Sequence, residues 1–81
     1  MKRSCKLSTL TVGSHAEILG FDSSAENQGR IKHMMEMGMT VGVKVEIAHK
    51  APFGGSIVIH CRRTLIGLRI SDASLVEVTR L

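Results

Sequence analysis

The amino-acid sequence predicts a small, mainly β domain in which five short strands form a barrel and one short helix is inserted. Its 81 residues are enough for a single domain with one modest core. Apolar and polar residues alternate over several short segments, which is typical of half-buried strands. Eight glycines provide turns between such segments. Because a barrel leaves few strand edges open, short strands at this spacing favour closure.

In most of the predicted strands, apolar side chains recur at every second position. The five strands are predicted at residues 15–21, 43–47, 57–61, 65–70 and 76–79. A loop from Pro52 to Ser56, which holds the chain's only proline, separates the second and third strands. Arg62 and Arg63 mark a hairpin turn between the third and fourth strands, although the Asn-Gly pair favoured there is missing. A single helical turn capped by Ser71 precedes the last strand.

The helix is predicted between the first and second strands. Ser23 and Glu26 stand three residues apart, as in a capping box that satisfies two backbone N–H groups at a helix start. Ile31, Met34 and Met35 follow at helical spacing and form one apolar stripe. Both methionines of this stripe are therefore predicted to lie in the core.

The residues after the stripe predict how the helix ends. Gly38 fits the left-handed position beyond a helix C-terminus, where a Cβ atom is unfavourable. Met37 and Met39 fit the apolar stripe less well than their neighbours do. They either fill the core or lie at the surface as an adaptable contact patch.

Basic residues are concentrated at the start of the chain. The net charge is +4, and three of the eleven basic residues lie within the first six positions. Residues 1–6 are therefore predicted to be a disordered basic tail, followed by a nearly neutral folded domain at 7–81. No apolar segment is long enough to span a bilayer, and the start lacks the apolar stretch of a secretory signal. A cytoplasmic protein without direct membrane insertion is expected.

No catalytic or metal-binding motif is readable in the sequence. Cys5 and Cys61 form no CxxC pair, which fits a reducing compartment, and the four histidines show no recognised ligand spacing. Gly54-Gly55 is not followed by the Lys-Ser/Thr ending of a phosphate loop. We therefore expect no enzymatic activity, no cofactor and no metal site. A metal-sensing or metal-binding barrel stays open as an alternative. So does a nucleic-acid-binding barrel, which the lack of Tyr and Trp disfavours.

Phe53 is one of only two aromatic residues and stands between Pro52 and the Gly54-Gly55 pair. Such a side chain either folds back over the open end of the barrel or projects outward as an anchor for a partner. Neither strand alternation nor helical spacing assigns Phe53 to the core. The sequence favours both interpretations equally.

An ordered set of short segments resembles the FeoA family of small accessory proteins of bacterial ferrous iron uptake. The set comprises Met35-Glu36-Met37-Gly38-Met39, Val41-Gly42, Val45-Glu46-Ile47, Ala51-Pro52-Phe53-Gly54-Gly55, Leu68-Arg69, Asp72-Ala73 and Val76-Glu77-Val78. It covers about residues 7–81, and it departs from the family where Val41 and Ser56 replace prolines that members often carry. The resemblance implies an SH3-like barrel and a functional association with FeoB, a membrane permease with a cytoplasmic GTPase domain. It implies no catalytic residue.

These observations together predict a protein-interaction module that docks on the cytoplasmic part of a FeoB-type permease. The predicted partner-binding residues are apolar residues that neither strand alternation nor helical spacing assigns clearly to the core, together with the loop residues that flank Phe53. They are Met37, Met39, Pro52, Phe53, Gly54 and Gly55. Nucleic acid is not an expected partner, and the sequence sets neither the oligomeric state nor the effect on the permease.

Overall fold

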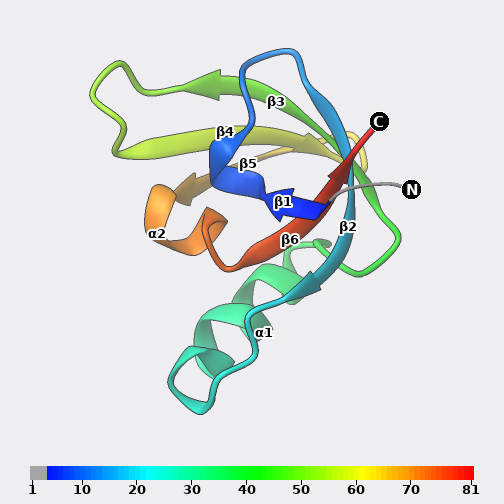
Figure 1. Ribbon diagram of the computed structural model, residues 1–81, viewed down its shortest axis with the longest axis vertical. Helices are drawn as coiled ribbons and strands as arrows, with labels where there is room; N and C mark the ends of the chain where they lie inside the picture. Colours follow the sequence, from blue (N-terminus) through cyan, green and yellow to red (C-terminus); the bar gives the residue numbers. More distant parts are fainter. Residues whose placement is uncertain (1–3) are drawn as a thin grey trace.

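One antiparallel sheet of six strands curls around the core in the computed structural model, which describes residues 4–81 (Figure 1). The strands are β1 (Ser4–Lys6), β2 (His15–Phe21), β3 (Lys44–Lys50), β4 (Ser56–Cys61), β5 (Thr64–Arg69) and β6 (Val76–Arg80). Their order across the sheet is β1-β6-β2-β3-β4-β5. The helices are the 3₁₀ turns η1 (Leu7–Thr9) and η2 (Ala25–Asn27), and the α-helices α1 (Gln28–Glu36) and α2 (Ile70–Ala73). The predicted mainly β fold with one inserted helix is confirmed.

The prediction of five strands is wrong by one, because part of the predicted basic tail is a strand. β1 pairs antiparallel with β6 and places Cys5 opposite Val78. The Lys6 Nζ atom also lies 2.9 Å from Glu77 Oε1 on β6. Ser4–Lys6 are thus held to the sheet by backbone pairing with a strand more than 70 residues away, which a local charge pattern does not reveal. Residues 1–3 of the predicted tail lie outside the described residues.

Two irregularities in neighbouring strands bend the sheet. The pairing of β2 with β6 shifts register between Ile18 and Gly20, and that of β3 with β4 shifts between Ile47 and His49. An extra residue of this kind bends a strand and increases its right-handed twist. The two central strands therefore curl, and the sheet wraps around a single core instead of staying open and flat.

The core follows the alternation that the sequence shows. Ile18, Ile47, Ile57 and Ile59 are each at most 1% exposed, and they come from three different strands. Full burial of one such side chain contributes roughly 1.5–3 kcal/mol to folding. α1 adds Ile31 and Met34 to the same cluster, so the helix is held by its apolar face.

The helix begins differently from the predicted capping box. The chain first forms the 3₁₀ turn η2, whose N-cap is Ser24 in an extended conformation. The buried Asn27 donates from its Nδ2 atom to Ser24 Oγ at 2.9 Å and to the Asp22 carbonyl at 3.3 Å. No side chain caps α1 itself, since η2 leads directly into it. A side-chain network around Asn27 therefore takes the place of a Ser23–Glu26 box.

The helix end is confirmed as predicted. Gly38 has a φ of +107°, and its N–H donates to the Met35 carbonyl at 3.0 Å. The Met39 N–H donates to the Met34 carbonyl at 3.1 Å, which completes a Schellman motif. This reversal carries Met39 into the core, where it is fully buried beside Met34. Met35, predicted in the core, is instead 42% exposed.

Candidate functional site

The loop between β3 and β4 presents Phe53 to solvent. The phenyl side chain is 99% exposed, which excludes the interpretation that it covers the end of the barrel. The loop is closed by two backbone hydrogen bonds, from Ala51 N–H to the Ser56 carbonyl and from Gly54 N–H to the Ala51 carbonyl, each 3.0 Å. Gly54 has a φ of +77°, which glycine adopts without strain. A hydrogen-bonded loop thus holds an unpartnered aromatic ring away from the core.

The structure does not bring the six predicted partner-binding residues together. Met39 is fully buried, so its assignment to a contact surface is wrong. Met37 is half-buried at the end of α1, whereas Pro52, Gly54 and Gly55 are exposed around Phe53. Figure 1 shows the β3–β4 loop and α1 well apart in the molecule. Two separate surfaces therefore replace the single predicted patch.

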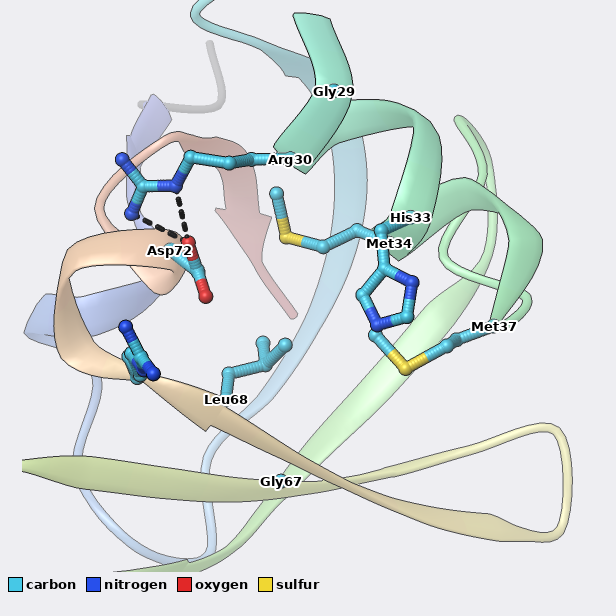
Figure 2. A pocket seen from close by; sticks show the side chains of 9 residues that line it. Gly29, Arg30, His33, Met34, Met37, Gly67, Leu68 and Asp72 are labelled. Atoms are coloured by element: carbon cyan, nitrogen blue, oxygen red, sulfur yellow. Dashed lines mark hydrogen bonds and ion pairs between the residues drawn. The ribbon is translucent and has the colours of Figure 1, made fainter. Parts of the chain in front are cut away.

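A cavity of about 390 Å³ lies between α1, β5 and α2, at the surface that includes Met37 (Figure 2). Its walls combine the apolar face of the helix with the end of β5. The lining residues are Gly29, Arg30, His33, Met34, Met37, Gly67, Leu68, Arg69 and Asp72. Sequence reasoning missed this cavity, because its two walls are separated by about 40 residues and no local pattern joins them.

One ion pair joins the two helical walls of the cavity. The Arg30 Nε atom donates to Asp72 Oδ1 at 2.6 Å, and its Nη2 atom donates to Ser71 Oγ at 3.0 Å. Figure 2 shows this guanidinium reaching from α1 across to α2. Because Asp72 offsets the charge of Arg30, Arg69 is the remaining permanent cation of the lining. Met34 and Leu68 are almost fully buried and give the cavity an apolar floor.

The arrangement offers little for metal or nucleophilic chemistry. Within residues 4–81, no three His, Cys, Asp or Glu side chains converge to hold a metal ion. His33 and Asp72 are the two members of these four residue types in the cavity lining. Burial raises the pKa of the Cys61 thiol, and the positive charge of Arg62 offsets only part of that shift. The thiol therefore stays protonated near neutral pH, and it lies 3.7 Å from the Gly38 carbonyl.

Comparisons with known proteins agree on one family. The model of the FeoA domain family matches residues 5–80. A comparison with curated protein sequences finds no match. Among residues 4–81, no helix has the length and apolar character needed to cross a bilayer.

Several solved structures share the fold. The FeoA-like protein of Clostridium acetobutylicum is 26% identical with a TM-score of 0.86, covering 100% of this chain and 91% of that one. Iron(II) transport protein A of Clostridium thermocellum is 34% identical with a TM-score of 0.83, covering 95% of this chain and 46% of that one. The zinc-complexed FeoA of Stenotrophomonas maltophilia, described as a procaryotic SH3 domain protein, is 28% identical with a TM-score of 0.79, covering 91% and 88%. The expected SH3-like architecture is confirmed.

Proposed function

This chain belongs to the FeoA family, and we propose that it is a non-catalytic accessory protein of ferrous iron uptake that binds the cytoplasmic part of a FeoB-type GTPase permease. The Stenotrophomonas relative is described as a suggested ferrous iron transport activating factor. A cytoplasmic location belongs to the same proposal, because the partner domain is cytoplasmic. An accessory role of this kind requires a surface for a partner and no active site.

The observation that carries the proposal is the exposure of Phe53. A phenyl ring that is 99% exposed gains nothing from the core of its own domain. The hydrogen-bonded loop limits the conformational entropy that the ring would lose on binding. Aromatic residues on such platforms are typical interface hot spots, because they fill a pocket in the partner and lose contact with water. Phe53 therefore supports a docking role for the β3–β4 loop.

The test is a binding measurement with the purified cytoplasmic domain of the FeoB-type permease from the same organism. We expect Phe53→Ala to weaken binding by about 1–3 kcal/mol, which is roughly 5- to 150-fold in Kd. The stability of the fold should change by less than about 1 kcal/mol, because the ring makes no core contact. Calorimetric titration and thermal unfolding of the same samples measure both quantities.

Val41→Ala is the matched control, since Val41 is also an exposed apolar residue, at 60%, but lies between α1 and β3. This variant should bind like the wild type. The proposal fails if the permease domain does not bind the wild-type chain. The assignment to Phe53 fails if Phe53→Ala binds normally, or if it unfolds with the loss of roughly 3–5 kcal/mol expected for a buried phenylalanine.

A further inference from the structure

β5 lies at one end of the sheet. Within residues 4–81 it pairs with β4 on one side, and no strand pairs with its other side. An edge strand of this kind presents a row of backbone N–H and C=O groups that can pair with another chain. The opposite edge is β1, which spans Ser4–Lys6 within the described part of the chain.

The pairing with β4 shows which residues of β5 face the open side. Cys61 and Thr64 pair across the two-residue turn, and the Ile70 N–H donates to the Gly55 carbonyl at the other end. In an antiparallel pair, residues that bond to the partner strand alternate with residues that do not. From Thr64 to Ile70 the even positions therefore bond to β4. The backbone N–H groups of Leu65, Gly67 and Arg69 and the carbonyls of Leu65 and Gly67 point to the open edge, whereas the Arg69 carbonyl lies at the N-cap of α2.

The cavity meets this edge. Gly67 has no side chain, so only its backbone lines the cavity, together with Leu68 and Arg69. On the other side, Figure 2 shows His33 and Met37 extending from the end of α1 toward β5. The open edge of β5 thus borders a hollow with an apolar floor. An open edge beside a pocket is the combination found where an extended peptide adds a strand to a sheet. In that mode, main-chain hydrogen bonds provide the affinity and the pocket selects a side chain of the peptide.

We propose that the β5 edge accepts an extended segment of a partner protein as an additional strand, with an apolar side chain of that segment in the cavity and a carboxylate beside Arg69. This inference deepens the proposed function, because the segment would belong to the same partner. Its experiment does not depend on that partner.

Charge and exposure define the chemistry of the segment. β5 contains no acidic residue, and Arg69 forms no ion pair among the residues that the structure describes. Leu65 is 65% exposed and shares a face of the strand with Gly67 and Arg69, because side chains alternate. A neighbouring strand with carboxylates on this face and apolar side chains on the other would pair favourably with Arg69 and direct its apolar side chains to the cavity side.

A second copy of the chain fits this edge less well. Its β5 would bring Arg69 and the adjacent Arg63, but no carboxylate, to an edge that already carries the same charges. Like charges on neighbouring strands are unfavourable. The observations therefore favour an acidic partner segment over a dimer.

The experiment uses the whole protein and a synthetic heptapeptide probe with an acetylated N-terminus and an amidated C-terminus. The sequence of the probe is Glu-Val-Glu-Leu-Glu-Val-Glu. In solution NMR of the free protein, the amides of Leu65, Gly67 and Arg69 should exchange rapidly, and those of Ile66 and Leu68 slowly. Saturating peptide should slow exchange at the first three amides by about tenfold or more, as expected for newly paired strand amides. Exchange at Ile66 and Leu68 should change little.

Two changes test the mode of binding without altering the core. The peptide amides form two alternating sets, and only one set can point toward β5. N-methylation of that set should weaken binding by about fivefold per lost hydrogen bond, whereas N-methylation of the other set should have little effect. Arg69→Glu should weaken binding by about tenfold. Arg80→Glu is the matched control at an exposed position on β6 and should bind like the wild type.

The proposal is overturned if the peptide does not bind at about 1 mM, near the weakest affinities relevant to such contacts. It is also overturned if a lysine version of the peptide binds equally well, or if binding leaves the three amides unprotected. Protection that appears without peptide and rises with protein concentration would show a dimer instead. Because the assay contains no permease, its outcome is independent of the binding test with the permease domain. The peptide can fail to bind while the permease domain binds, and the peptide can bind while the permease domain does not.

Discussion

Gly38 combines three local roles at the end of α1. Its positive φ reverses the chain, its N–H binds the Met35 carbonyl, and the reversal lets Met39 enter the core. A Cβ atom at this position would lie 3.7 Å from Arg62 Cδ, an ordinary van der Waals distance. Crowding is therefore not the reason for glycine here. The reason is the left-handed backbone, which β-branched residues adopt only with strain.

We predict that Gly38→Val destabilises the fold by about 1–3 kcal/mol. For a domain of this size each kcal/mol lowers Tm by roughly 4–8 °C, which thermal unfolding resolves easily. Gly38→Asn is the control, because asparagine tolerates the left-handed region better and should cost less. Equal Tm values for the valine variant and the wild type would contradict the role assigned to Gly38.

At the scale of an element, the β4–β5 hairpin has an unfavourable turn. Arg62 and Arg63 have φ values of +50° and +68°. These are the angles of a two-residue turn that matches strand twist, a turn that Asn-Gly forms without strain. The strands on either side are paired throughout, so the ladder from Ser56 to Arg69 imposes this conformation on the arginines. The backbone of the two arginines is therefore strained, and a turn such as Asn-Gly would adopt the same angles without that strain.

Replacing both residues, Arg62→Asn with Arg63→Gly, should stabilise the protein by about 1 kcal/mol, because the new residues accept positive φ at less cost. Denaturant unfolding of the double variant measures the gain. Arg62→Ala with Arg63→Ala removes the same charges but keeps the strained angles, and it should give no gain. If the alanine pair were equally stabilising, charge and not backbone strain would explain the effect.

At the scale of the whole molecule, two surfaces with different chemistry are open to partners. The β3–β4 loop offers one aromatic ring, whereas the β5 edge offers backbone groups, an apolar cavity and Arg69. They meet at one end of the β4 strand, since the loop leads into Ser56 and Arg69 at the end of β5 pairs with Ser56. Phe53→Ala removes the ring and leaves Arg69 in place, whereas Arg69→Glu leaves the ring in place, so the two variants distinguish the contributions of the two surfaces.

We predict that the isolated protein does not hydrolyse GTP. The sequence lacks the phosphate loop with which P-loop GTPases hold the nucleotide. A phosphate-release assay should give the background rate, with the permease's GTPase domain as the positive control. Arg30→Ala alters the cavity and serves as the matched variant. Turnover by the wild type that this single substitution abolishes would contradict the prediction.

The amino-acid sequence by itself determined the features that depend on neighbouring residues. Alternation located the strands from β2 to β6, and Gly38 located the end of the helix, because both signals act within a few residues. The same local patterns gave the family resemblance that the FeoA match confirmed. They failed at Met35, since which side of a short helix meets the core depends on the chain that packs against it. They also failed at Met39, which the reversal at Gly38 carries into the core.

Only the tertiary structure decided the features that join distant residues. Pairing with β6 made Ser4–Lys6 a strand instead of a tail, and no signal within the first six residues predicts that partner. Solvent exposure settled the two equal interpretations of Phe53 in favour of an outward ring. The cavity and the open edge arise because the sheet ends at β5 while α1 stands beside it. Such contacts depend on how the strands are arranged in space, and local periodicity does not predict which strands and helices become neighbours.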